Sequence, residues 1–367
     1  MSSRRLAAVV LAAGEGTRMR SERPKPLHLL CGRPMVVHVL DALAEVAVGR
    51  VVVVVGYAAE RVSKLVQAYA PSDLGVEFVE QRVQRGTGDA VSVALTGFGD
   101  DALEEGDILV LPGDTPLLRP PTIAALVRTH RQSGAAATLL TAVIDNPTGY
   151  GRVVRAKDDR VLRVVEDVDA DADERAIHEV NTSIYCFRSS VLAPALRRLT
   201  PENAQGEYYL TDIVEVLADA GYQVTSMVAD DPVETAGVND RAQLAVAEAE
   251  LRARINERWM RRGVTMVDPE HTYIDVGVEL APDVTLFPGT ILRGSNVVGA
   301  GAEVGPHTHL VDTVVGERAV VDTTVARQAT IGADARVGPF TSLEPGATVP
   351  PGTVTGAHYR GPDDRED

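Results

Sequence analysis

The feature that most constrains the fold is a six-residue spacing of apolar side chains in the last third of the chain. Val298, Val304 and Leu310 are six positions apart, and the same spacing returns further on. This second series consists of Val325, Ile331, Val337, Leu343 and Val349. Hexapeptide spacing is typical of a left-handed parallel β-helix, in which three hexads make one coil. We therefore predict such a β-helix, of roughly five coils, over residues 264–356, with another Val-rich β domain as the alternative.

Residues 1–236 show a different pattern, in which short apolar runs alternate with helix-like segments. The runs are typical of buried strands and cover Val9–Leu11, Val51–Val55, Val76–Glu80 and Ile108–Leu111. The segments between them favour helices over Met35–Glu45, Glu60–Tyr69 and Asp89–Thr96. This alternation predicts an α/β, Rossmann-like domain with a mostly parallel sheet and helices on both faces. Ligands of such sheets bind beyond the carboxyl ends of the strands.

Residues 237–263 are expected to form a linker helix between these two domains. Its apolar side chains recur every three or four positions, at Leu244, Ala247, Leu251, Ile255 and Trp259. Gly263 suits the end of a helix. Beyond the β-helix, residues 357–367 are predicted to be an acidic, disordered tail.

The charge balance restricts the partners of the chain. The 367 residues carry a formal net charge of −16, which argues against nucleic acid or an anionic membrane as a partner. Against this acidic background, five basic residues cluster near the N-terminus, at Arg18, Arg20, Arg23, Lys25 and Arg33. A local cationic cluster on an acidic protein indicates a small anionic ligand.

The two cysteines, Cys31 and Cys186, form either one disulfide or two free thiols. We expect free thiols in a reducing compartment, because no secretory signal is recognisable. No apolar run approaches the ~20 residues that a membrane span requires. We therefore expect a cytoplasmic protein.

A glycine loop follows the first apolar run and precedes two cations. Gly14 and Gly16 let the backbone approach a ligand and turn its N–H groups inward, and Arg18 and Lys25 supply charge for phosphates. A P-loop would require a Gly-Lys pair, and a dinucleotide loop would require glycine at position 19, which is Met19. The loop is therefore either a nucleoside triphosphate site for transfer at phosphorus or an ordinary strand–helix turn.

The segment Leu11–Met19, followed by Lys25 between two prolines, resembles the L-x-x-G-x-G-T-R-M…P-K signature of sugar-nucleotide pyrophosphorylases. Later segments narrow the match: Gln81–Gly88, Pro112–Leu117, Pro147–Arg152, Val165–Glu166, Glu179–Thr182, Asn203–Asp212 and Gly237–Asn239. In this order they resemble the GlmU family of bifunctional N-acetylglucosamine-1-phosphate uridylyltransferases and glucosamine-1-phosphate acetyltransferases. The resemblance covers about residues 5 to 355.

The resemblance implies uridylyl transfer from UTP to N-acetylglucosamine 1-phosphate, which gives UDP-N-acetylglucosamine and pyrophosphate. It implies that Arg18 contacts the leaving pyrophosphate, that Lys25 contacts the α-phosphate, and that Asp114 and Asn239 hold Mg²⁺. It assigns the nucleotide to Leu11, Ala12, Ala13, Gly14, Lys25, Gln81, Gly86 and Thr87. It assigns the sugar phosphate to Gly151, Glu166, Asn181, Thr211 and Asn239. It also implies a homotrimer held together through the β-helix.

Taken one by one, these residues have plainer interpretations. Asp114 after a strand is often a turn or helix cap, Asn239 a turn residue and Lys25 a solvated lysine. The Gln81 amide, with a donor and an acceptor, suits the edge of a uracil. Another hexose 1-phosphate, with UTP or dTTP, remains an alternative substrate pair, and a non-catalytic nucleotide-sugar-binding assembly protein is the alternative to an enzyme.

The resemblance is incomplete in the second domain. The family continues past the position of His358 through further coils that carry its acetyltransferase residues and much of its acetyl-CoA site. We therefore expect the chain to lack acetyltransferase activity. His307 and His309 form an H-x-H pattern that we place on one strand face, either as a metal-binding pair or as a solvated or stacked pair.

Overall fold

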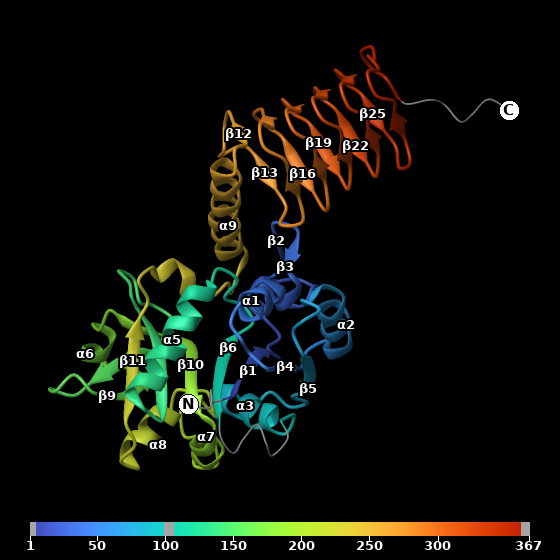
Figure 1. Ribbon diagram of the computed structural model, residues 1–367. Coiled ribbons are helices and arrows are strands. Elements are labelled where there is room, and N and C mark those ends of the chain that lie inside the picture. The colour runs from blue at the N-terminus through green and yellow to red at the C-terminus, as the bar shows by residue number, and fades with distance from the viewer. Residues whose placement is uncertain (1–4, 99–105, 361–367) are drawn as a thin grey trace. The chain divides into compact units, whose positions relative to one another are not determined.

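The computed structural model describes residues 5–98 and 106–360 and divides into two compact units (Figure 1). Unit 1 comprises Met1–His28 and Pro34–Leu244, and unit 2 comprises Leu29–Arg33 and Ala245–Asp367. The part of the predicted acidic tail at 361–367 lies outside the described residues. Just before it, the Ser342 backbone N–H donates to the Tyr359 carbonyl at 2.9 Å, so Tyr359 contacts the last coil.

Unit 1 is built on a nine-stranded sheet whose main path runs β11-β7-β10-β6-β1-β4-β5. These strands are β1 (Arg5–Ala12), β4 (Arg50–Val55), β5 (Val76–Glu80), β6 (Gly106–Pro112), β7 (Ala137–Val143), β10 (Glu179–Arg188) and β11 (Val224–Val228). All neighbours on this path pair in parallel except β10, which is antiparallel to both β6 and β7. The hairpin of β8 (Arg152–Arg155) and β9 (Val161–Val165) extends the sheet beside β10. The mostly parallel sheet is confirmed, and the reversed direction of β10 was not predicted.

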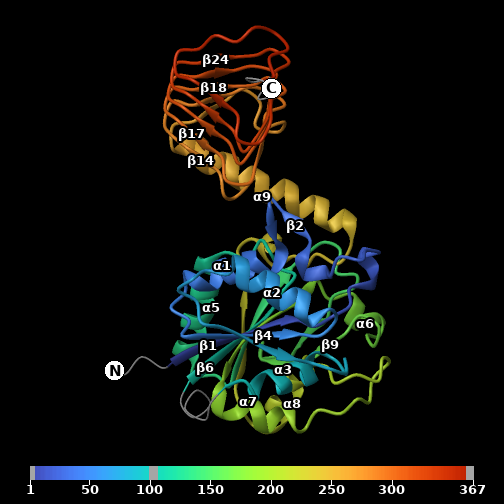
Figure 2. The same ribbon diagram turned by 90° about the vertical axis from the view of Figure 1, so that its right-hand side faces the viewer.

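Helices cover both faces of this sheet, as Figure 2 shows. They are α1 (Met35–Ala44), α2 (Ala59–Tyr69), α3 (Thr87–Leu95), α5 (Pro120–Ser133), α6 (Ala172–Arg175), α7 (Ser189–Leu196) and α8 (Ile213–Asp219), with short 3₁₀ turns η1 (Thr17–Met19), η2 (Lys25–Leu27) and η3 (Pro232–Thr235). Strand β4 contributes side chains to the core on each face of the sheet. Val52 and Val54 join the core under α3 and α7, and Val53 joins the core under α1 and α2. A strand buried on both faces reads as a continuous apolar run, which is why the sequence pattern predicted it.

Unit 2 contains most of α9 (Arg241–Arg261) and a three-sided parallel β-helix. Its three five-stranded sheets run β12-β15-β18-β21-β24, β13-β16-β19-β22-β25 and β14-β17-β20-β23-β26. The strands are β12 (Thr265–Met266), β13 (Tyr273–Ile274), β14 (Glu279–Leu280), β15 (Thr285–Leu286), β16 (Ile291–Arg293), β17 (Val297–Val298), β18 (Glu303–Val304), β19 (His309–Val311), β20 (Val314–Val315), β21 (Val320–Val321), β22 (Val325–Arg327), β23 (Thr330–Ile331), β24 (Arg336–Val337), β25 (Ser342–Leu343) and β26 (Thr348–Val349). The predicted five-coil, left-handed β-helix is confirmed.

The coils differ in length, and this corrects two details of the sequence analysis. Leu292 pairs with Leu310, 18 positions on, whereas Leu310 pairs with Ala326, only 16 positions on. Because residues are missing at the corners there, Ala326 is fully buried and Val325, the first residue of the second six-residue series, is 43% exposed. Val325 therefore does not share the inward position of the other residues in that series.

The prediction that His307 and His309 lie on one strand face is also wrong. His307 lies in a corner turn, with a φ of 47°, before β19 begins at His309. His307 is exposed, whereas the His309 ring is half-buried and burial lowers its pKa.

A short hairpin from the N-terminal third of the chain belongs to unit 2. It is formed by β2 (Leu29–Leu30) and β3 (Arg33–Pro34), with Cys31 and Gly32 at its tip. The Cys31 N–H donates to Glu248 Oε2 on α9 at 2.8 Å, and the Cys31 carbonyl accepts from the Val276 N–H at 3.0 Å. Gly32 has a φ of +81°, and an added Cβ would lie 2.4 Å from Asp275 Oδ2, so this contact requires glycine.

Cys31 and Cys186 are both buried and unlinked, which confirms the prediction of free thiols. Among the helices in residues 5–98 and 106–360, none combines the length and the apolar character needed to cross a bilayer.

Candidate active site

The predicted site lies where β1, β5 and β6 end, at the carboxyl edge of the unit 1 sheet. A backbone hydrogen bond holds the loop after β6 against the end of β1, because the Gly113 N–H donates to the Leu11 carbonyl at 2.8 Å. A Cβ on Gly113 would lie 3.0 Å from that carbonyl oxygen, so glycine permits the close approach. Asp114, the next residue, is thereby fixed beside the glycine loop.

The glycine loop carries its two cations on two short 3₁₀ turns. Gly16 has a φ of +67°, and a Cβ there would lie 2.5 Å from Lys25 Cβ, so the loop folds directly onto the lysine. Met19 and Leu27 are 1% and 2% exposed and fasten η1 and η2 to the core. Lys25 begins η2 between Pro24 and Pro26, and this rigid backbone limits where its ammonium group can go.

The four residues predicted for phosphate and metal converge. The Lys25 ammonium forms an ion pair with Asp114 Oδ2 and donates to Asn239 Oδ1 at 2.8 Å. Arg18 Nη2 donates to the same Asn239 oxygen at 2.9 Å. These side chains come from three loops far apart in the sequence. The Lys25 side chain is only 14% exposed and that of Asp114 24%, so their charges are partly shielded from water.

Residues at the start of α9 support this cluster, and the sequence analysis did not single them out. Gln243 Oε1 accepts from the Asn239 N–H at 2.7 Å, and Arg241 Nε donates to the Met19 carbonyl at 3.1 Å. The Val238 N–H donates to the Asp114 carbonyl at 2.9 Å. The start of α9 thus holds Asn239 and the glycine loop in one place. No periodicity or motif signals the contact between Arg241 and Met19, because the two residues lie 222 positions apart.

The Asp114 carboxylate and the Asn239 amide oxygen fit a magnesium ion. Both oxygens already face one cation, the Lys25 ammonium. Mg²⁺ prefers hard oxygen ligands and is commonly held by one or two protein groups plus water and substrate phosphates. Within the described residues no group of three or more His, Cys, Asp or Glu side chains suits a metal, which leaves a two-ligand site of this kind.

The residues predicted for the nucleotide base surround Gln81, which directly follows β5. The Gln81 side chain is buried, at 4% exposure, and its Nε2 donates to the Gly86 carbonyl at 3.2 Å and to Asp89 Oδ2 at 2.7 Å. Thr87 Oγ1 accepts from the Leu210 N–H at 3.0 Å. Of the predicted residues at and just after the end of β1, Ala12 and Ala13 are buried, while a Cβ on Gly14 would meet nothing within 4 Å. The Gly14 backbone is therefore open to a ligand.

Four of the residues predicted for the sugar phosphate form a second cluster. Thr211 Oγ1 donates to Glu166 Oε1 at 3.0 Å, and the Asn181 N–H donates to the Gly151 carbonyl at 2.8 Å. A Cβ on Gly151 would lie 3.5 Å from Glu166 Oε2. Asn239, which was predicted for the sugar phosphate as well as for the metal, lies in the phosphate cluster with Lys25.

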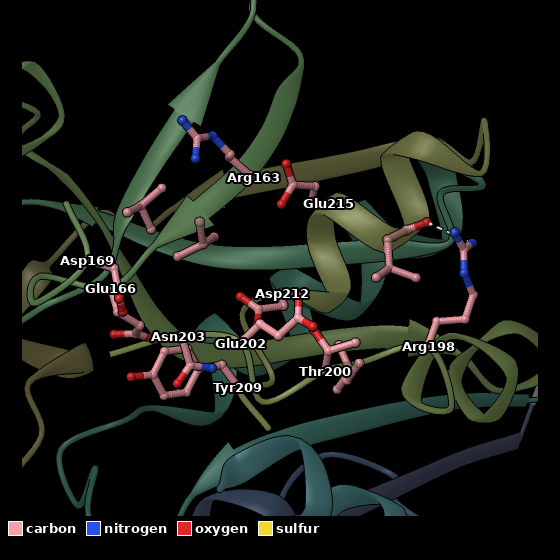
Figure 3. A pocket seen from close by; sticks show the side chains of 14 residues that line it. Arg163, Glu166, Asp169, Arg198, Thr200, Glu202, Asn203, Tyr209, Asp212 and Glu215 are labelled. Atoms are coloured by element: carbon pink, nitrogen blue, oxygen red, sulfur yellow. Dashed lines mark hydrogen bonds between the residues drawn. The ribbon is translucent and has the colours of Figure 1, made fainter. Parts of the chain in front are cut away.

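A pocket of about 350 Å³ opens beside Glu166 (Figure 3). Four other carboxylates line it, namely Asp169, Glu202, Asp212 and Glu215. Burial raises the pKa of Glu166, and the Thr211 hydrogen bond partly opposes this. Burial, together with the charges of Glu166, Glu215 and Asp169, raises the pKa of Asp212 to about 6. Apart from Glu166, these acidic residues were not predicted as part of the site.

An α/β sheet with a glycine loop, two cations and a carboxylate–amide pair at its carboxyl edge has the groups that a nucleotidyltransferase needs. In agreement, residues 8–212 match the family of MobA-like NTP transferase domains. The chain is 46% identical over 343 residues to the bifunctional protein GlmU of Desulfitobacterium hafniense strain DSM 10664 / DCB-2, which covers 94% of the chain and 73% of that relative. It is 46% identical to that of Bifidobacterium longum strain DJO10A, over 93% of the chain and 73% of the relative. It is 47% identical to the bifunctional protein GlmU of Thermobifida fusca strain YX, over 90% of the chain and 68% of the relative.

The chain therefore belongs to the GlmU family within the MobA-like NTP transferases. It is a nucleotidyltransferase, and enzymes of this kind generally use a divalent metal.

Proposed function

We propose that the chain transfers the uridylyl group of UTP to N-acetylglucosamine 1-phosphate. A phosphate oxygen of the sugar phosphate attacks the α-phosphorus, and the bond between that phosphorus and the bridging oxygen breaks to release pyrophosphate. The observation that carries this proposal is the convergence of Arg18, Lys25, Asp114 and Asn239 at the carboxyl edge of the sheet. Such transfer needs positioning and cations rather than covalent catalysis by the protein.

The two cations have separate roles in this proposal. Lys25, held by its flanking prolines and largely shielded from water, neutralises the α-phosphate as negative charge builds up there. Arg18 is exposed, and its guanidinium can bind the leaving pyrophosphate through two parallel hydrogen bonds. Asp114 and Asn239 would hold Mg²⁺, which when bound neutralises and orients the phosphates.

The sugar cluster supplies acceptors for hydroxyl and amide groups. The half-buried Glu166 carboxylate can accept from sugar hydroxyls while Thr211 holds it in place. Asn181 donates to the Tyr185 hydroxyl at 2.8 Å, and its Oδ1 is buried without a hydrogen-bond partner among the described residues. A buried acceptor of this kind favours a ligand that brings a donor, such as the N–H of an N-acetyl group. This is the support for the sugar identity.

A pyrophosphate-release assay tests this proposal with UTP and dTTP against the 1-phosphates of N-acetylglucosamine, glucose and galactose. We expect the highest kcat/KM for UTP with N-acetylglucosamine 1-phosphate and loss of activity in excess chelator. Higher kcat/KM with another hexose 1-phosphate would favour the alternative substrate pair. Binding of nucleotide-sugar without any turnover would favour a non-catalytic assembly protein.

The proposal extends to assembly and compartment. On one face of the β-helix, Val297 and Val314 are neighbours in register and are 43% and 45% exposed. Exposed apolar side chains on a flat sheet face support packing against other copies, and we propose a homotrimer. The two free thiols suit a reducing compartment, and we propose the cytoplasm.

A further inference from the structure

We propose that Asp89 is a positioning residue that selects the base: it holds the Gln81 amide so that only its carbonyl oxygen faces the nucleotide. Such a pocket requires a base that donates a hydrogen bond, as uracil does, and disfavours cytosine. This inference rests on the proposed function and adds to it a role for Asp89 in the preference for UTP over CTP.

The Gln81 side chain has little freedom. Its backbone N–H donates to the Val55 carbonyl at 2.8 Å, which fixes the residue at the end of β5 beside β4. The side chain is 4% exposed. Both hydrogens of its amide nitrogen are used, one by the Gly86 carbonyl and one by Asp89 Oδ2. Its Oε1 takes part in neither of these hydrogen bonds, so it is the group left for a ligand.

The chemistry of the two partners dictates which way the amide faces. A backbone carbonyl and an ionised carboxylate can only accept hydrogen bonds, so both must meet the NH₂ end of the amide. Turning the amide over would place Oε1 against two acceptors and leave the carboxylate unpaired. Asp89 lies in the first turn of α3, where the helix dipole favours its negative charge. The same charge therefore holds Gln81 in one orientation.

A fixed acceptor distinguishes pyrimidines by their N3 position. Uracil carries an N–H at N3 and donates to a carbonyl oxygen, whereas cytosine has an unprotonated N3 that only accepts. Cytosine at this position would face Gln81 Oε1 with no hydrogen between them. A site built to pair one hydrogen-bonding group discriminates strongly against a ligand with the wrong one.

The experiment compares kcat/KM for UTP and CTP, with N-acetylglucosamine 1-phosphate, in the wild type and in Asp89→Asn. An asparagine can donate to Gln81 Oε1 through its own NH₂, which lets the amide turn over and present Nε2 to the base. We expect the UTP/CTP ratio to fall about 10- to 100-fold, by a loss with UTP and a gain with CTP. Asp89→Glu, which keeps the carboxylate, should retain a preference for UTP. Ser92→Ala is the matched control, because Ser92 lies on the same helix and its hydroxyl donates to the Gly88 carbonyl.

A purely structural role for Asp89 would lower kcat/KM equally for both nucleotides, and an unchanged ratio in Asp89→Asn would overturn the proposal. Titration calorimetry with UTP and with CTP in place of turnover gives the same comparison for binding. If the wild type binds UTP but releases no pyrophosphate, the proposed function fails, while the ratio of the two binding constants still tests Asp89.

Discussion

Replacing Asp212 by asparagine should stabilise unit 1 at neutral pH. Asp212 immediately precedes α8, faces the acidic pocket with Glu166, Asp169 and Glu215, and its side chain makes no capping hydrogen bond to the helix. Asparagine is as good a residue as aspartate at this position of a helix. The substitution therefore removes a repelled, partly buried charge and leaves the local backbone unchanged.

The size and pH dependence of the effect follow from the pKa of Asp212, which is about 6 in the folded protein against an ordinary value of 3.8. At about 1.4 kcal/mol per pH unit, keeping this group ionised at pH 7.5 costs up to about 3 kcal/mol. The pocket is open to solvent, so we expect about 1–2 kcal/mol. Because the folded pKa is raised, the cost is fully present above pH 6, falls as the pH drops from 6 to 3.8, and disappears below that, where both states are protonated. The stabilisation by Asp212→Asn should therefore be largest above pH 6 and should shrink as the pH is lowered.

Urea unfolding followed by far-UV circular dichroism between pH 4 and 8 measures this difference in free energy of unfolding. Trp259, the only tryptophan, lies in unit 2, so its fluorescence reports that unit separately. Asp173→Asn, at an exposed position on α6, is the control and should change little at any pH. Equal stabilisation at pH 4 and pH 7.5, or destabilisation at pH 7.5, would refute the reasoning.

The other predictions concern activity and assembly. Lys25→Ala and Arg18→Ala should each lower kcat on the order of 100-fold with unchanged circular dichroism, since both lie on loops; near-normal kcat in both would exclude them from catalysis. Asp114→Asn and Asn239→Ala should raise the Mg²⁺ concentration needed for half-maximal activity, and an unchanged requirement in both would rule out the proposed ligands. Light scattering should give the mass of a trimer for the full chain and a smaller species for a chain ending at Arg262; a monomeric full chain would contradict this.

The sequence predicted the elements whose residues repeat or stand next to one another. Strand β4 is a continuous valine run because both its faces are buried, and the inward positions of the β-helix repeat because each coil fills the same interior. The Gly14–Lys25 loop could be placed at the sheet edge because it directly follows β1. These features are local and carry their signal in a short segment.

What the sequence did not predict depends on contacts between distant segments. The direction of β10 is set by its pairing with β6 and β7, and the inward position of Ala326 by the shorter corners of its coil. The support of Met19 by Arg241 and the acidic surroundings of Asp212 join residues that no periodicity connects. The contact between Asp89 and Gln81 is an exception, because the two residues are only eight positions apart. Asp89 directly follows the Gly86-Thr87-Gly88 segment, and this position could have marked it as a candidate site residue.

The hairpin at Leu29–Arg33 affects how this protein can be divided or recombined. A single break after Leu244 yields a second fragment that lacks the segment bonded to Glu248 and Val276. That fragment would leave the Val276 N–H and the Glu248 carboxylate without the partners that the first fragment carries, so the two pieces should reassociate when they are mixed. A gene fusion that exchanged the β-helix at one junction would leave the hairpin facing a foreign surface. The β-helix unit therefore cannot be moved intact into another protein by joining the two chains at a single position.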